Sequence, residues 1–166
     1  MKLMKTLLLL AVFTLGFSTV NAQTKVAHIN SEELVSSMPE YKALQSKLEK
    51  LGKTYQDEAT SLENSLKAKF QKFDQEAASQ TQETNALRQK EVELDAKKLE
   101  QFKMEAMNDI QAQEQAGMAP ILEKAQKAVE DVASEQGFDY VLNVATLVVA
   151  KGKDILPDVK TKLGIQ

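Results

Sequence analysis

The 166-residue sequence has no cysteine, no tryptophan and a single histidine. Without cysteine, the chain forms no disulfide bonds and lacks the thiolate ligands of zinc sites. The histidine, His28, alternates with Val26 in a short apolar segment, which favours a packed or edge-exposed side chain over a catalytic base. The sequence also has no HExxH motif, no CxxC motif and no glycine-rich phosphate loop. We therefore expect no enzyme activity, with no catalytic residue, no metal and no cofactor.

Long apolar runs are missing as well, except near the start of the chain. Residues 1–22 have the features of a secretory signal peptide, with Lys2 and Lys5 before an apolar run and the small-residue sequence Val20-Asn21-Ala22 at the end. The apolar run is too short to span a bilayer. No cysteine follows it, which excludes a lipid anchor on a cysteine. We expect an exported chain, cleaved near Ala22, of 144 residues (166 minus 22).

An excess of basic residues is also absent. The sequence has 21 Lys and Arg against 24 Asp and Glu, and cleavage would remove two lysines, leaving 19 against 24. This balance argues against nucleic acid as a partner, because nucleic-acid binding needs a basic face. Residues 67–103 are nearly neutral, with eight basic and seven acidic residues. This charge pattern indicates either a solvated face or a weak attraction for acidic partners or a membrane lipid surface.

Residues 53–116 contain neither glycine nor proline, and good helix formers dominate them. Apolar residues recur from Tyr41 to Ala77 at steps of three and four, covering 36 residues in ten turns. This spacing of 3.6 residues per turn predicts one apolar helix face with little supercoil. The members of this stripe are Tyr41, Leu44, Leu48, Leu51, Tyr55, Ala59, Leu62, Leu66, Phe70, Phe73 and Ala77.

A second apolar stripe follows the polar run 79–85, which is the natural place for a turn. If the turn centres near Gln82, the numbers of facing residues sum to about 164. The stripes then meet as pairs: Phe70 with Leu94, Leu62 with Phe102, Tyr55 with Ile110, and Leu44 with Ile121. We therefore predict a long antiparallel helical hairpin at residues 39–136, which we call the arm.

The flanking segments, 23–38 and 137–166, predict a small β-rich base. Residues 25–30 favour a strand, and a short helix capped by Ser31 follows until Met38-Pro39. Gly137 is suited to end the return helix as a left-handed cap. We expect residues 138–142 and 147–150 to form two strands of a hairpin, and a last helix to follow a cap at Asp154. The predicted fold class is mainly α with a small β part.

Three residues interrupt the helical pattern near the base of the arm: Gly52, Gly117 and Pro120. Glycine costs about 1 kcal/mol in a helix relative to alanine, and proline removes a helical hydrogen bond. One interpretation is a tolerated kink with a close helix approach at Gly117. The other interpretation is a hinge at the root of the arm.

Met104 and Met107 lie off the apolar stripe, roughly 200° and 140° around the helix from Phe102. Methionine suits adaptable contact surfaces, so these residues are candidate contacts for a partner. Isolated exposed apolar side chains are also common in ordinary proteins.

Two segments resemble the family of Skp (OmpH)-type periplasmic chaperones: Lys25-Val26-Ala27-His28-Ile29-Asn30, and residues 120–142, which include Gly137-Phe138-Asp139-Tyr140. Asp154-Ile155 and the final helix are similar too. The resemblance covers essentially the whole exported chain. The best-known members are strongly basic, whereas this chain is acidic, so no lipopolysaccharide site is carried over. His28 replaces an apolar residue of the family.

The resemblance implies a homotrimer in the periplasm, with a trimeric β-barrel base and three arms that enclose unfolded outer-membrane β-barrel proteins. Residues of the trimer core would be Val26, Ile29, Tyr140, Leu142 and Val148. The implied function is an ATP-independent holdase that prevents aggregation. The alternative is a structural coiled-coil spacer or adaptor of the cell envelope.

Overall fold

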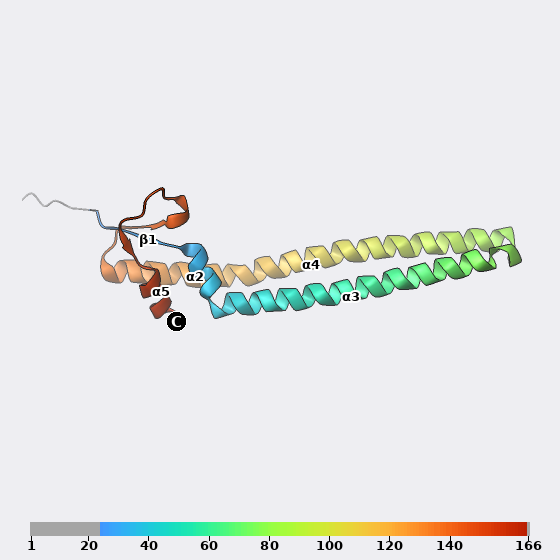
Figure 1. Cartoon of the computed structure of the whole chain (residues 1–166), viewed down its shortest axis with the longest axis horizontal. Coiled ribbons are helices and arrows are strands. Elements are labelled where there is room, and N and C mark those ends of the chain that lie inside the picture. The colour runs from blue at the N-terminus through green and yellow to red at the C-terminus, as the bar shows by residue number, and fades with distance from the viewer. Residues whose placement is uncertain (1–23, 166) are drawn as a thin grey trace, which may run out of the picture.

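The computed structural model describes residues 24–165, so the predicted signal peptide at residues 1–22 lies outside the described residues. The protein is mainly helical with a small β part, as the sequence predicts, and a long arm extends from a small base (Figure 1). The elements are β1 (Val26–Ile29), α2 (Ser31–Ser37), α3 (Pro39–Glu76), η1 (Ala77–Ser79), α4 (Gln82–Gln136), β2 (Tyr140–Asn143), η2 (Val144–Thr146), β3 (Lys153–Asp154) and α5 (Leu156–Lys162). Among residues 24–165, no helix has the length and apolar character needed to span a membrane.

The arm consists of α3 and α4, which lie side by side and run in opposite directions (Figure 1). An ion pair joins Glu40 to Lys124 near the base, and another joins Glu76 to Arg88 near the tip at 2.7 Å. The residue numbers of both pairs sum to 164, which is the value that the two apolar stripes predict. Tyr55 and Asp109 give the same sum, and the Tyr55 hydroxyl donates a 2.8 Å hydrogen bond to the Asp109 carboxylate.

Local hydrogen bonds define the ends of the arm helices. The Thr81 hydroxyl accepts a hydrogen bond from the backbone N–H of Thr84 and caps the start of α4. At the tip, the Asn85 amide donates to the carbonyl of Ala77 at 2.9 Å and ties α4 to η1. Gly137 ends α4 with a φ of 69°, so the predicted left-handed cap is confirmed.

The base contains a three-stranded sheet in the order β2-β1-β3, with both outer strands parallel to β1. The predicted hairpin between residues 138–142 and 147–150 is therefore wrong. The Asn143 side chain accepts from the N–H of Ala145, and the η2 turn leads the chain away from β2. Residues 147–150 form no strand, and the third strand, β3, lies further along the chain and pairs with β1. β1 thus lies between β2 and β3, so the two later strands do not pair with each other as a hairpin.

The main core lies where the base meets the arm. Alternation along β1 directs Ala27 and Ile29 inward, and Met38, fully buried, connects α2 to α3. The buried residues of this core are Ala27, Ile29, Leu34, Met38, Leu44, Ile121, Ala125, Ala128, Val132, Ile155, Leu156 and Val159. The core includes residues from both arm helices, so the arm and the base share it. The Asp154 carboxylate accepts a 2.9 Å hydrogen bond from the backbone N–H of Leu156 at the start of α5, where the sequence predicts a cap at Asp154.

Candidate functional site

The outward face of the sheet is an exposed apolar surface. Parallel register places Val26 beside Tyr140 and His28 beside Leu142, so these four side chains share one face. Val26, Tyr140 and Leu142 are exposed, whereas their neighbours Ala27 and Ile29 are buried on the other side. We call the set Val26, His28, Tyr140, Leu142, Val148 and Val149 the outer sheet face. The last two belong to the segment between η2 and β3, and Val148 is fully exposed.

The structure separates the five residues that the sequence predicts for a trimer core. Four of them, Val26, Tyr140, Leu142 and Val148, are exposed. Ile29 differs, because it is only 3% exposed and packs in the core of its own chain. The reason is the alternation of strand side chains, which sends residues 26 and 29 to opposite faces of the sheet. Ile29 is therefore unsuited to contact another copy of the chain.

His28 occupies a structural position on the central strand of the outer sheet face. Its Nε2 atom lies 3.1 Å from the carbonyl oxygen of Gly152, which makes Nε2 the donor in this hydrogen bond. The bond fastens the segment before β3 to β1. The Nδ1 atom is buried and has no hydrogen-bond partner within residues 24–165. Within the same range, no group of three or more His, Cys, Asp or Glu residues is arranged to hold a metal ion.

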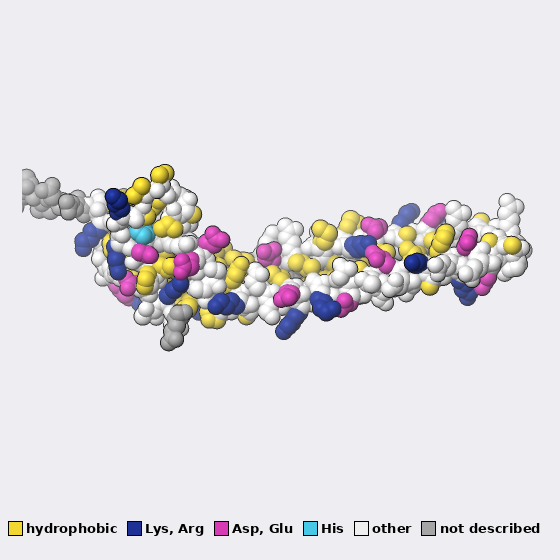
Figure 2. Space-filling view, viewed as in Figure 1, with side chains coloured by type: hydrophobic (Ala, Val, Ile, Leu, Met, Phe, Trp, Pro, Cys, Tyr) yellow, Lys and Arg dark blue, Asp and Glu magenta, His cyan; other side chains and the backbone are white. Residues whose placement is uncertain are grey.

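The arm exposes a second set of apolar side chains. Met104 and Met107 are 60% and 71% exposed, in agreement with their predicted position away from the helix contact. Leu62, Phe70 and Leu94 are also exposed, although the sequence pattern assigns them to the contact stripe. Away from the base, α3 and α4 have only each other as helical neighbours within residues 24–165, so part of a wide apolar stripe stays uncovered. Figure 2 shows hydrophobic side chains along the seam between the two helices, with basic and acidic side chains mixed around them.

A cavity of about 340 Å³ lies between the arm helices near Gly52 and Met107. The rings of Tyr55 and Phe102 pack edge to face in its wall, with centroids 5.9 Å apart. The hydrogen bond to Asp109 holds Tyr55 in place and raises the pKa of its hydroxyl. Met107 therefore has an apolar groove beside it, which the sequence pattern did not indicate.

The three interrupting residues have different surroundings. A Cβ atom added at Gly117 would lie 2.4 Å from a methyl carbon of Leu44, so the close helix approach predicted there is present. An added Cβ at Gly52 would have no atom within 4 Å. Helices α3 and α4 continue through Gly52, Gly117 and Pro120 without a break. A hinge at these residues stays a prediction.

The base and the arm both match a known protein family. The model of a family described as "Outer membrane protein (OmpH-like)" matches residues 25–163, which include β1, the whole arm, the outer sheet face and α5. The chain belongs to the OmpH-like family. The match extends over both the base and the arm, so it rests on the whole arrangement of elements.

Relatives of this OmpH-like chain include two proteins named "Chaperone protein Skp". The one from Pectobacterium atrosepticum is 29% identical over 146 residues, which cover 86% of this chain and 87% of the relative. The one from Photorhabdus laumondii is 30% identical over 164 residues, covering 94% and 97%. The crystal structure of an OmpH-like protein from Caulobacter crescentus has the same fold, with a TM-score of 0.78 at 17% identity, covering 86% of this chain and 85% of that one.

Proposed function

We propose that this OmpH-like chain is an ATP-independent holdase chaperone of the periplasm, which binds unfolded outer-membrane proteins and prevents their aggregation. The relatives named "Chaperone protein Skp" support this proposal, and so does the signal-peptide pattern of residues 1–22. The observation that carries it is the distribution of exposed apolar side chains, which occur both on the outer sheet face and along the arm. A holdase that acts as an assembly needs one surface for assembly and a separate surface for its client.

The outer sheet face supports assembly into a homotrimer. A three-stranded sheet with an uncovered apolar face and two free edge strands gains stability by pairing with further strands. Closure of three such sheets into a β-barrel would remove every free edge and bury Val26, Tyr140, Leu142 and Val148. Three arms would then extend from one barrel as a cage, and each arm would remain an antiparallel helical hairpin.

The arm supports loose binding of a client through many weak contacts. Met104 and Met107 are our proposed client contacts, because methionine adapts its shape to varied apolar groups. Gly52 and Pro120 are the proposed hinge residues that would let the arms adjust to clients of different size. Gly117 lies in the same region, but its contact with Leu44 indicates close packing there.

An aggregation assay tests the function directly. A urea-denatured β-barrel protein is diluted, without ATP, into buffer with or without the chain, and turbidity is recorded. We expect the wild-type chain to suppress aggregation. Met104→Asp combined with Met107→Asp should suppress it at least several-fold less well, because two charges replace exposed apolar contacts.

A matched control separates the loss of the two methionine side chains from the effect of two added charges. Asn108→Asp combined with Gln111→Asp adds the same two charges at the same spacing, at exposed polar positions of α4. We expect this control to protect the client nearly as well as the wild type. No protection by the wild-type chain would contradict the holdase function and favour the spacer or adaptor alternative. Equal protection by both double variants would show that the two methionines are not client contacts.

A further inference from the structure

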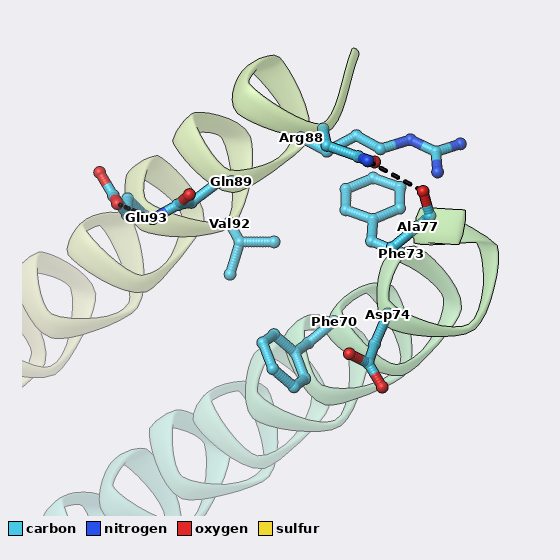
Figure 3. A pocket seen from close by; sticks show the side chains of 9 residues that line it. Phe70, Phe73, Asp74, Ala77, Arg88, Gln89, Val92 and Glu93 are labelled. Carbon is cyan, nitrogen blue, oxygen red and sulfur yellow. Dashed lines mark hydrogen bonds between the residues drawn. The ribbon is translucent and has the colours of Figure 1, made fainter. Parts of the chain in front are cut away.

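A cavity of about 490 Å³ lies near the tip of the arm, between the end of α3 and the start of α4. Figure 3 shows Phe70 and Phe73 on α3 and Val92 on α4 directed toward the gap between the helices. Phe70 is 58% exposed although it forms part of the apolar stripe. The volume falls within the range of pockets that bind small molecules, roughly 300–1,000 Å³. The cavity is thus an open hollow of the arm with apolar side chains on both helices.

The charge of Arg88 is already neutralised within this cavity wall. Its guanidinium lies 4.7 Å from the centroid of the Phe73 ring, and its Nη2 atom pairs with Glu76 at 2.7 Å. These two contacts hold the aromatic wall in one position. Because Glu76 balances the arginine, the cavity gains no net positive charge from this pair.

The remaining charges at the rim are acidic. Asp74 and Glu93 are exposed and line the cavity, one on each helix (Figure 3). Within residues 24–165, neither carboxylate forms an ion pair with a lysine or an arginine. Glu93 accepts a hydrogen bond from Gln89, at 3.3 Å. The cavity therefore combines an aromatic floor with two carboxylates that favour a cation nearby.

We propose that this tip cavity binds an aromatic or branched aliphatic side chain of an extended polypeptide that carries a Lys or Arg next to that side chain. The apolar side chain covers Phe70 and Val92, and the adjacent cation lies within reach of Asp74 or Glu93. An anionic lipid surface fits poorly, because the two carboxylates would repel it. The inference deepens the proposed client binding, on which it rests, by assigning a sequence preference to one site on the arm.

Methyl NMR of the exported chain, residues 23–166, tests this proposal at the cavity itself. An aromatic ring bound beside Val92 shifts the signals of its two methyl groups. Three short peptides of a Gly/Ser background serve as probes: one with Phe next to Lys, one with Phe next to Glu, and one with Ser next to Lys. We expect the Phe–Lys peptide to shift the Val92 methyl signals at the lowest concentration. The Phe–Glu peptide should require at least about threefold more, and the Ser–Lys peptide should cause no shift.

Variants separate the apolar contribution from the charged one. Phe70→Ala should abolish the shifts caused by the Phe–Lys peptide. Asp74→Asn combined with Glu93→Gln should leave the wall intact and remove the difference between the Lys and Glu peptides. Glu105→Gln is the matched control, because Glu105 is exposed on α4 and accepts from Gln101 as Glu93 does from Gln89. This control should behave as the wild type.

Unchanged Val92 signals with every peptide, or equal binding of the Lys and Glu peptides by the wild type, would overturn the proposal. The same preparation is used in the aggregation assay, so the two claims can fail separately. Protection of the denatured client without peptide shifts would reject the tip site alone. Peptide shifts without protection would support the tip site and contradict the holdase function.

Discussion

Two glycines of the arm differ sharply in their surroundings, although the sequence pattern treats them alike. Gly117 faces Leu44, and an added Cβ would lie 2.4 Å from one Leu44 methyl carbon and 2.9 Å from the other. Leu44 is itself buried in the core. Contacts this short force either the leucine or the helix to move. Gly52 has open space around its Cα.

Alanine substitutions at these two glycines should therefore have opposite effects. Gly117→Ala should lower the free energy of unfolding, since overpacking costs about 1–3 kcal/mol and exceeds the gain in helix propensity. Gly52→Ala should raise it by up to about 1 kcal/mol. Urea unfolding followed by circular dichroism measures both. Leu44→Ala in the Gly117→Ala background should relieve the overpacking, and equal effects of the two alanines would contradict this assignment.

Among the residues whose pKa is shifted, Asp95 has the clearest structural cause for its shift. Its carboxylate pairs with Lys69, across the arm, and with Lys98, and these hydrogen bonds and charges lower its pKa from the ordinary value of 3.8. A carboxyl group whose pKa is lower in the folded state stabilises the fold above its unfolded pKa. That contribution is lost as the pH falls through the folded pKa.

We expect the arm to lose stability on acidification below about pH 4, and Asp95→Asn to reduce that pH dependence. Side-chain carboxyl NMR shifts recorded between pH 2 and 6 give the pKa of Asp95. An Asp95 pKa at or above the ordinary aspartate value of 3.8 would contradict the role of Lys69.

Met38 connects α2 of the base to α3 of the arm. It ends α2, precedes Pro39 at the start of α3, and has no solvent-exposed surface. Met38→Ala should lower the free energy of unfolding by about 2–5 kcal/mol through the cavity it leaves. It should also raise hydrogen exchange in β1 and α2. Met104→Ala, at an exposed position of α4, should change stability by less than about 0.5 kcal/mol. Similar losses in both variants would show that Met38 does not hold the base to the arm.

The long helices could be predicted from the sequence because their signals are local and repeated. Ten turns of apolar spacing, a polar turn and the Gly137 cap all point to the same arrangement. The third strand could not be predicted in this way. Leu147 to Ala150 has the composition of a buried strand, but Val148 and Val149 are exposed there. Strand pairing depends on β1, more than 100 residues earlier, and periodicity within a short segment carries no information on such a distant partner.

The outer sheet face and the exposed surfaces of the arm could be predicted only in part, because they too depend on contacts between distant segments of the chain. The sequence prediction grouped Val26 with Ile29, although residues three apart on a strand lie on opposite faces. The structure places them on opposite faces of the sheet. The exposure of Met104 and Met107 follows from the helical wheel, which depends on local geometry alone. The tip cavity depends on how η1 and the adjoining turns of α3 and α4 leave Phe70 uncovered, and no sequence motif marks that gap.

At the scale of the whole molecule, assembly should depend on the outer sheet face. Val148→Asp places an unpaired charge where we propose that three copies meet, and burying such a charge is strongly unfavourable. We expect light scattering to give the mass of a trimer for the wild type and of a monomer for this variant. Gln111→Asp adds the same charge on the arm and should remain trimeric. A trimeric Val148→Asp variant would show that Val148 lies outside the subunit interface.

We propose that three copies of this chain together hold one unfolded client. Size-exclusion chromatography with light scattering tests it most directly, after a small urea-denatured β-barrel protein is diluted into a slight excess of the chain. We expect one soluble complex whose mass equals three copies of the chain plus one client. A complex with one or two copies of the chain, or an aggregated client beside a free chain, would contradict it.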